Sequence, residues 1–374
     1  MKIGIMTLQG AKNSGAVLQA YALSKTIKNF GHEVDIINFI SDGEFERSNS
    51  KISLNKAILA RKIYYLFFKK SIAERNKLFE NFSKQYLKTN PADHRIRENE
   101  LSQLTNSYDC LICGSDQIWS QDPKLYDKSD AYFINFPYRG KRVSYAASFG
   151  DKIEHTKDIT EKVINYVNKF DNVSVREDEA RCYLKNNGID AEVVVDPTLL
   201  INSDEWKKIA ITSKIKDKYI LYFSVNSRKY SINIAKKISK EIGLKVIEIN
   251  PHPKSWNSGF EKHYSVGPRE FLGYILHADY VVTNSFHGTV FSTLFNKKFV
   301  AAFDQVNGEI KNESRKESLL SRVGLLDVIT TVNNDIDYKM LENINWNLVN
   351  EKIAELRMCS LKYLENSIRD VKND

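Results

Sequence analysis

The segment Val281–Ser292, VVTNSFHGTVFS, places one histidine, His287, among small polar residues between two apolar stretches. The apolar residues before it indicate a strand, and those after it fit the start of a helix. The amino end of a helix exposes N–H groups with partial positive charge, which bind phosphate or carboxylate. An imidazole exchanges a proton near neutral pH. The segment therefore predicts a site that holds an anion and moves a proton.

Four neighbours of His287 extend this candidate site. Ser285 and Thr289 can contribute hydroxyl groups, and Gly288 lets the backbone approach a ligand closely. Asn284 completes the set of candidate ligand-binding residues. The alternative is that Ser285 only caps the helix and that His287 is a buried imidazole with satisfied hydrogen bonds. The grouping of small polar residues around one histidine favours the site.

Arg176 stands at a second predicted strand-to-helix boundary, in the sequence NVSVREDEA. A guanidinium group can hold a carboxylate or a phosphate through two parallel hydrogen bonds. The alternative is a surface salt bridge to Glu177, Asp178 or Glu179, which would contribute little stability. The sequence leaves both interpretations open.

A third polar cluster follows the predicted strand YDCLIC, where the sequence GSDQIWS contains Asp116, Gln117 and Trp119. A carboxylate and an amide can bind sugar hydroxyls, and an indole can cover the apolar face of a sugar ring. These residues are therefore candidate acceptor-binding groups. The alternative is that Ser115 or Asp116 caps a helix and that Trp119 belongs to the core.

Two further patterns complete the set of candidates. Near the start of the chain, the glycine-containing loop QGAKNSG precedes a predicted helix and adds Asn13 and Gln19 as candidate acceptor ligands. Near the end, the charged run NGEIKNESR contains Lys311, a candidate donor ligand. Charge runs of this kind mostly form solvated surfaces.

These polar clusters follow predicted strands in two similar series. Short apolar strands alternate with amphipathic helices from Lys2 onward, and a second series begins near residue 219 after a lysine-rich stretch. The pattern predicts two Rossmann-like, doubly wound α/β domains, 1–205 and 206–344, and a C-terminal helix, 345–374, that packs back on the first domain. Ligands of such sheets bind at the carboxyl ends of the strands, so we expect the two domains to face a cleft.

Composition narrows the classes of function. The 374 residues carry a formal net charge of +8 and are 42% hydrophobic, as expected of a folded protein with anionic partners. The sequence has no RNA-binding signature, zinc-ligand spacing or arginine-rich run, so we expect no nucleic acid and no metal. Cys110 and Cys113 have redox-motif spacing, but three residues apart on a strand they point to opposite faces, which predicts core positions.

The expected location is cytoplasmic. The sequence begins without a signal-peptide pattern and has no apolar run long enough to span a bilayer. The stretch 55–88 is helical, aromatic and basic together. Such a helix either packs its aromatic face on its own domain or makes peripheral contact with the inner membrane face.

The motifs together resemble those of a known family. NSGAVLQAYALSKTI, YDCLICGSDQIWS, VSVRE, VVDPTLL and TNSFHGTVFS occur in the order found in polysaccharide pyruvyl transferases, from Ile3 to about Leu326. The resemblance implies a GT-B-like fold and transfer of the pyruvyl group of phosphoenolpyruvate to a sugar of a cell-surface polysaccharide or its precursor. The product is usually a cyclic ketal, and phosphate is released. The resemblance also implies His287 as the catalytic histidine, Arg176 as a donor ligand and a further basic residue, for which Lys311 is the candidate.

This reaction agrees with the chemistry expected from the residues. Phosphoenolpyruvate is an anion that an N–H-rich pocket can bind, and its methylene carbon must gain a proton, which His287 can supply. Asp116 is the candidate base for the hydroxyls of a sugar or lipid-linked saccharide acceptor, and Arg176 can stabilise charge on the leaving phosphate. No step requires a metal or an organic cofactor; phosphoenolpyruvate acts as a co-substrate.

Two other functions are compatible with the same residues. A GT-B glycosyltransferase with a nucleotide-sugar donor would use the same two-domain layout and the same helix start. A non-catalytic protein that binds lipid-linked saccharides would use the basic charge and the segment KIYYLFFKK. The identity of the released group, phosphate or nucleotide, and the presence of turnover distinguish the three functions.

Overall fold

The protein, represented by a computed structural model, contains two compact units. The first comprises Met1–Lys51, Ser83–Ile201 and Ile353–Asp374, and the second comprises Ile52–Phe82 and Asn202–Lys352. The structure describes residues 1–10, 12–42, 56–121, 129–150, 153, 155–211, 215–225, 229–251, 255–303, 305–306, 309–310, 313–331 and 338–369. Residues 52–82, which the sequence analysis assigned to the N-terminal domain, group with the second unit.

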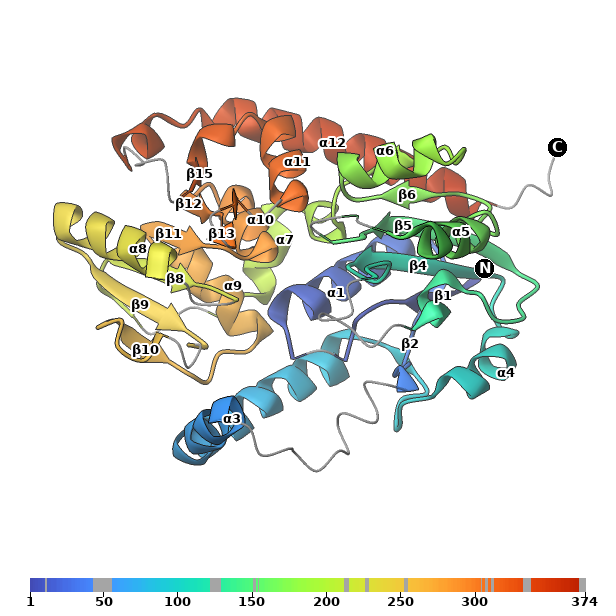
Figure 1. The fold of residues 1–374 in the computed structure, drawn as a ribbon, viewed down its shortest axis with the longest axis horizontal. Coiled ribbons are helices and arrows are strands. Elements are labelled where there is room, and N and C mark those ends of the chain that lie inside the picture. The colour runs from blue at the N-terminus through green and yellow to red at the C-terminus, as the bar shows by residue number, and fades with distance from the viewer. Residues whose placement is uncertain are drawn as a thin grey trace. The chain divides into compact units, whose positions relative to one another are not determined.

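The first unit is built on a seven-stranded parallel sheet (Figure 1). Its strands are β1 (Lys2–Met6), β2 (Glu33–Ile37), β3 (Thr89–Asn90), β4 (Cys110–Asp116), β5 (Lys141–Ala147), β6 (Ser174–Val175) and β7 (Glu192–Val193). Its helices are α1 (Ser14–Asn29), α4 (Leu101–Thr105), α5 (Lys157–Val167) and α6 (Asp178–Asn186). The strand order is β3-β2-β1-β4-β5-β6-β7, so the winding reverses between β1 and β4.

The second unit repeats this winding in a six-stranded parallel sheet of order β10-β9-β8-β11-β12-β15. Its strands are β8 (Tyr219–Phe223), β9 (Lys245–Ile249), β10 (Glu261–His263), β11 (Tyr280–Thr283), β12 (Lys298–Ala302) and β15 (Ile329–Thr330). A two-stranded antiparallel sheet pairs β13 (Gln305–Val306) with β14 (Glu309–Ile310). The prediction of two doubly wound α/β units is therefore confirmed.

The helices of the second unit are α3 (Lys56–Tyr86, most of its length), α7 (Ser203–Ile209), α8 (Lys229–Ile242), α9 (Pro268–His277), α10 (Phe286–Leu294) and α11 (Ser314–Val323). The last helix, α12 (Trp346–Ile368), begins in the second unit and ends in the first. Among the described residues, no helix combines the length and the apolar composition needed to cross a bilayer.

Unbroken apolar sequence explains why the central strands form two-sided sheets. Residues 3–6 of β1 and all seven residues of β4 are buried. Alternating polar residues would leave one face in water, whereas these runs require helices on both faces of the sheet. Cys110 and Cys113 of β4 are completely buried, which confirms their prediction as core residues.

The end of α12 is part of the first unit. The Ser360 hydroxyl accepts a hydrogen bond from Val195 N–H at 3.0 Å. The Tyr363 hydroxyl donates to the Ser144 carbonyl, the oxygens lying 3.1 Å apart. Leu364 is completely buried. These contacts place the C-terminal helical segment against β5 and the chain that follows β7.

We predict that Gly114→Ala destabilises the protein by about 3 kcal/mol or more, because overpacking against backbone cannot be relieved by a side-chain rotation. A Cβ on Gly114 would lie 2.2 Å from the Tyr145 carbonyl oxygen of the neighbouring strand. Gly10→Ala is the matched control, because the three atoms nearest to its Cβ would all belong to the far end of the Arg95 side chain and not to backbone. Urea unfolding measures both; equal free energies for the two variants would contradict the prediction.

Candidate active site

The histidine turn joins β11 to α10, as the sequence predicts, and its polar side chains build the turn itself. The Ser285 hydroxyl accepts a hydrogen bond from Gly288 N–H at 3.2 Å and so caps the helix. The Ser285 carbonyl accepts the Thr289 hydroxyl at 3.1 Å. Ser285 N–H donates to Thr283 Oγ1 at 3.0 Å. The turn is therefore held in one conformation by its own hydroxyl groups.

Gly288 is required by packing within this turn. A Cβ at this position would lie 2.4 Å from Thr283 Oγ1. Any side chain would therefore displace Thr283, whose hydroxyl oxygen accepts the Ser285 N–H. The glycine lets the first turn of α10 lie directly against the end of β11.

His287 is the second residue of α10, and only 7% of its surface is exposed. Its ring packs edge-on against Phe286, with the ring centroids 5.2 Å apart. The first turn of a helix carries N–H groups without intrahelical partners and stabilises negative charge. An anion bound at this helix end would therefore lie next to an imidazole.

A buried lysine that the sequence analysis did not identify supports the histidine turn. Lys316, on α11, is 1% exposed. Its ammonium donates to the Asn284 carbonyl at 2.9 Å and to the Ala302 carbonyl at 3.3 Å. Glu313 lies 3.2 Å from the ammonium and balances its charge. The surrounding sequence NESRKES is mostly charged and polar, which is typical of a solvated surface. The burial of this lysine was therefore not predictable from the local sequence.

Two buried hydroxyl groups lie at the same end of the second sheet. Ser224 directly follows β8, and the next residue, Val225, donates its N–H to Asn284 Oδ1 at 2.9 Å. Ser314 begins α11, two residues before Lys316. Both serines are buried, with 8% of Ser224 and 9% of Ser314 exposed. Within the described part of the chain, neither hydroxyl makes a hydrogen bond. Buried hydroxyls normally have hydrogen-bond partners, so these two are candidates for contact with a ligand.

Arg176, in the first unit, follows β6 and is buried among carboxylates. Its Nη1 donates to Asp196 Oδ2 at 2.8 Å. Its Nη2 lies 3.9 Å from Asp116 Oδ1, and its Nε lies 3.7 Å from Glu177 Oε2. The side chain is 2% exposed. The alternative of a surface salt bridge is therefore wrong, because the ion pair with Glu177 is enclosed within the protein.

Asp196 is the residue that orients Arg176, and the sequence analysis did not include it among the site residues. Its Oδ1 accepts hydrogen bonds from Thr198 N–H at 3.0 Å and from the Thr198 hydroxyl at 2.7 Å. Its Oδ2 accepts the Arg176 guanidinium and, at 3.3 Å, the Ser115 hydroxyl. A carboxylate held at both oxygens keeps its guanidinium partner in place. The signal for it was the motif VVDPTLL, noted only as part of the resemblance.

Asp116 ends β4 at the reversal point of the first sheet. Its backbone has a φ of 73°, in the left-handed region that few residues other than glycine adopt. Its Oδ1 accepts the N–H of Gln117 at 2.9 Å. Strained backbone at the carboxyl end of a central strand is typical of functional sites, so the position agrees with the role predicted for Asp116.

The two candidates from the first turn are engaged within the protein. Asn13 caps α1, since its side-chain oxygen accepts Gly15 N–H at 2.9 Å. Gln19 is completely buried, and its amide donates to the Thr7 hydroxyl at 2.7 Å. The Gln19 carbonyl oxygen accepts Ser115 N–H at 3.4 Å. Gln19 therefore joins the ends of β1 and β4 and has a structural role in the described residues.

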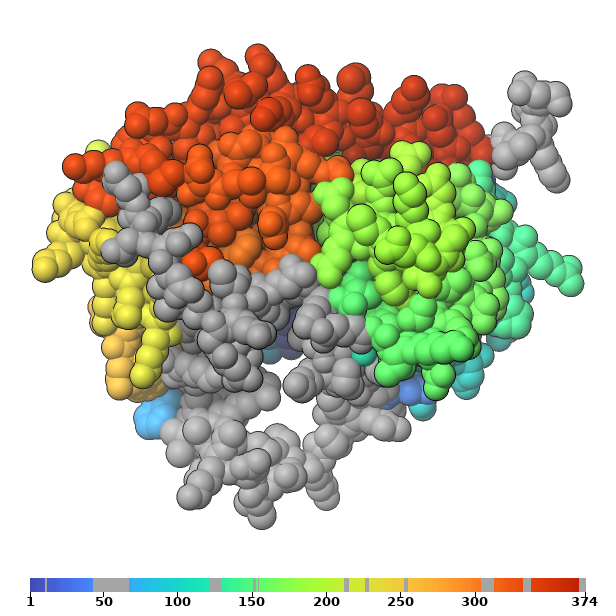
Figure 2. Space-filling view, turned by 45° about the horizontal axis from the view of Figure 1, so that its top comes forward, coloured from blue at the N-terminus to red at the C-terminus, as the bar shows by residue number. Residues whose placement is uncertain are grey.

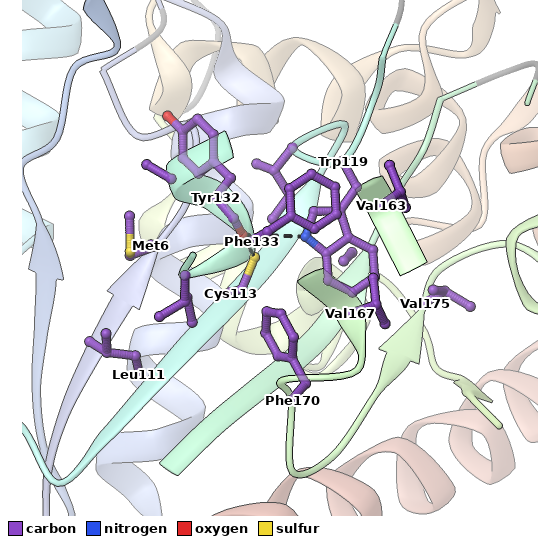
Figure 3. Close-up of a cluster of buried hydrophobic side chains, with 14 of the residues drawn as sticks. Met6, Leu111, Cys113, Trp119, Tyr132, Phe133, Val163, Val167, Phe170 and Val175 are labelled. Carbon is purple, nitrogen blue, oxygen red and sulfur yellow. Dashed lines mark hydrogen bonds between the residues drawn. The ribbon is translucent and has the colours of Figure 1, made fainter. Parts of the chain in front are cut away.

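The structure corrects the interpretation of Trp119. The side chain is completely buried in the hydrophobic core of the first unit (Figure 3). Its ring stacks on Phe133 with centroids 5.2 Å apart and meets the edge of Phe170 at 5.6 Å. Its indole N–H donates to the Tyr132 carbonyl at 3.3 Å. With both its ring and its N–H occupied, Trp119 cannot cover a sugar ring.

The predicted residues thus gather at the carboxyl end of each sheet. The five candidates from 284 to 289 form one turn of the second unit, and Asp116, Gln117 and Arg176 follow β4 and β6 of the first. Lys311 lies outside the described residues. In the described ranges, no cluster of three or more His, Cys, Asp or Glu side chains is arranged to hold a metal ion.

We expect Lys316→Met to lower the free energy of unfolding by about 3 kcal/mol, because it leaves the Glu313 carboxylate buried without its cation. Adding Glu313→Gln should recover part of the loss. Lys298→Met, which removes a partly exposed ion pair with Glu342 and a contact of the ammonium with the Tyr280 ring, should cost only about 1 kcal/mol. Urea titration of the variants checks this; the same small loss in both lysine variants would contradict it.

Comparison with known proteins agrees with this architecture. The solved HepE protein of Anabaena, in complex with UDP, has a TM-score of 0.52 at 11% identity, covering 98% of this chain and 99% of that one. The S. aureus MnaA–UDP structure has a TM-score of 0.50 at 11% identity, covering 95% and 90%. At these identities the likeness shows the fold alone, and it confirms the predicted GT-B-like class of two parallel-sheet α/β units.

Sequence comparison identifies the family. A search of curated proteins gives no significant match. The family model for polysaccharide pyruvyl transferase matches residues 13–304, which include the turn with His287, the arginine Arg176 and the strand end with Asp116. The match extends over more than half of the chain, and the chain therefore belongs to the polysaccharide pyruvyl transferase family.

Proposed function

We propose that the protein transfers the pyruvyl group of phosphoenolpyruvate to a sugar and releases inorganic phosphate. The observation that carries the proposal is the position of His287, in the first turn of α10 at the carboxyl end of β11, in a chain of this family. The reversal point of a doubly wound sheet is where ligands bind, and β11 borders that point in the second unit. The position combines an anion-binding helix end with a proton carrier.

The anionic donor fits the groups around this turn. The amino end of α10 favours a phosphate or carboxylate, and the free hydroxyls of Ser224 and Ser314 can donate hydrogen bonds to it. Lys316 acts through the backbone, because its ammonium is engaged by the Asn284 and Ala302 carbonyls. We assign Ser224, Ser314, Ser285 and Thr289 to the surroundings of the donor and Lys316 to the positioning of the turn.

The first chemical step is protonation of the donor at its methylene carbon. His287 supplies this proton as its protonated imidazolium, and the double bond then gives a cation at C2 that the neighbouring oxygen stabilises. A sugar hydroxyl adds to C2, and a base removes its proton. Phosphate then leaves with the electron pair of its C–O bond. The second hydroxyl adds to C2 and gives up its proton to the departing phosphate, which closes the ketal. Each step uses only the donor, the acceptor and side chains of this protein.

The first unit supplies the candidate base and a candidate donor ligand. Asp116 lies at the carboxyl end of β4 with its carboxylate partly exposed, 12% of the side chain being accessible, so it can reach an acceptor hydroxyl. Arg176 is the candidate donor ligand of this unit, and its ion pair with Asp196 holds the guanidinium in place. The acceptor is a sugar, free or carried on a nucleotide or lipid.

His287→Gln should reduce phosphate release from phosphoenolpyruvate at least about 100-fold, because an amide cannot supply the proton. His277→Gln, on α9 of the same unit, is the matched control and should retain turnover. The assay uses a panel of sugar acceptors, and NMR of the product detects the ketal methyl group. Wild-type turnover by His287→Gln would remove the catalytic assignment, and nucleotide release from a nucleotide sugar would favour glycosyl transfer instead.

Ser224→Ala and Ser314→Ala should each raise the KM for phosphoenolpyruvate by about 10-fold, because a hydrogen bond to a charged ligand is lost. Their unfolding free energies should remain unchanged, since these hydroxyls have no partner in the described residues. Ser360→Ala, which removes the acceptor of Val195 N–H, should show the opposite pattern of lower stability and unchanged KM. Steady-state kinetics and urea unfolding measure both quantities; an unchanged KM in both serine variants would contradict the assignment.

A further inference from the structure

An aromatic group that the proposed chemistry does not use is exposed on the second unit. Phe67 of α3 is 74% exposed, and Trp256 is 55% exposed. Phe68, the next residue after Phe67, stacks on Tyr264 with ring centroids 4.1 Å apart and lies 5.7 Å from the Trp256 ring. Single exposed apolar residues are common, but a contiguous aromatic group at the surface indicates an interaction site.

The remainder of α3 holds this group in place. The Ser265 hydroxyl contacts the Ser71 carbonyl at 3.2 Å and the Glu74 carboxylate at 2.9 Å. A Cβ on Gly267 would lie 2.5 Å from the Leu78 side chain, so the helix rests closely on this part of the unit. The aromatic residues therefore belong to a fixed surface. In Figure 2, light-blue atoms of the described part of α3 reach the surface at the lower left.

Positive charge accompanies the aromatic residues. Lys69 and Lys70 follow Phe68 on α3, and both are exposed. The nearest acidic residue along the helix, Glu74, accepts a hydrogen bond from Ser265. The stretch 61–70, RKIYYLFFKK, contains four basic residues and no acidic one. Aromatic rings settle at the boundary between headgroups and acyl chains, and lysines beside them are attracted to anionic lipids.

We infer that Phe67, Phe68, Lys69, Lys70, Trp256 and Tyr264, here called the aromatic–basic surface, dock the protein on an anionic lipid bilayer. Insertion of the exposed rings removes apolar area from water, while the lysines approach the charged headgroups. Lysine stems can lie along the apolar surface with their ammonium groups in the headgroup layer. The contact is peripheral and is independent of the transferase reaction proposed above. A protein partner would not require anionic lipid, which separates the two explanations.

Vesicle co-sedimentation of the full-length protein tests the inference. Binding should be strong to vesicles that contain phosphatidylglycerol, at least about 10-fold weaker to pure phosphatidylcholine, and reduced by raised salt concentration. Phe67→Ser with Trp256→Ser should weaken binding at least about 10-fold, since two inserted rings are lost. The control is Met358→Ser on α12. Met358 is 65% exposed, which lies between the values for Phe67 and Trp256, and its replacement should leave binding unchanged.

The charge contribution is tested separately. Lys69→Gln with Lys70→Gln should weaken binding to the anionic vesicles by roughly 25-fold, about 5-fold for each lysine. Lys236→Gln with Lys237→Gln removes an exposed lysine pair of α8 and alters the net charge equally. This control should bind as the wild-type protein does. Equal weakening in both pairs would mean that net charge acts without a defined surface, and would overturn the inference.

A direct readout comes from Trp256 itself. Brominated phosphatidylglycerol should quench part of the tryptophan fluorescence of the wild-type protein, because two other tryptophans, Trp119 and Trp206, are completely buried. The quenching should disappear in Trp256→Phe, which still binds the vesicles through its phenyl ring. Absence of wild-type binding to anionic vesicles, or quenching that persists in Trp256→Phe, would overturn the inference.

Discussion

The buried ammonium group of Lys316 holds the turn on which the proposed chemistry depends. At the carboxyl end of a parallel sheet the last carbonyl groups have no strand partner, and a buried carbonyl without a donor is costly. Lys316 donates to two of these groups, from Asn284 and Ala302, while Glu313 balances its charge. Because Asn284 directly precedes the cap of α10, this interaction holds the start of the helix that carries His287.

The carboxyl end of the first sheet also holds a buried cation, but the partners of this cation are carboxylates. This sheet has the same winding, and a buried guanidinium, that of Arg176, lies beyond the carboxyl ends of β4 and β6. Asp196 pairs with it at 2.8 Å and is itself held by Thr198. An ammonium group can serve several carbonyls in different directions, whereas a guanidinium donates in one plane. The lysine therefore supports a backbone turn, whereas the arginine is held among carboxylate groups.

Unpaired hydroxyls distinguish the ligand-binding end of the second sheet from its core. Within the described residues, the hydroxyls that build the turn, those of Ser285 and Thr289, are bonded, while those of Ser224 and Ser314 are not. Most polar groups are satisfied in a folded protein, so these two exceptions are candidates for contact with a ligand. The aromatic–basic surface is an exception of another kind, since apolar rings there remain in water.

The sequence by itself determined the alternation of strands and helices, the doubly wound fold and the strand-to-helix turn that contains His287. These features depend on periodicity and on residues adjacent in the chain, so local patterns suffice to predict them. The role of Ser285 as a cap is local in the same sense, because its partner Gly288 is three residues away.

Only the tertiary structure decided which polar and aromatic side chains are buried, because burial depends on segments distant in the chain. Trp119 belongs to the core because Phe133 and Phe170 fold against it, although the sequence places it in a polar cluster. Lys316 has the sequence context of a surface residue, yet its partner carbonyl on Asn284 is 32 positions away. Gln19 contacts Ser115 across 96 positions. No local pattern encodes such pairings, since they arise from the order in which parallel strands are wound into a sheet.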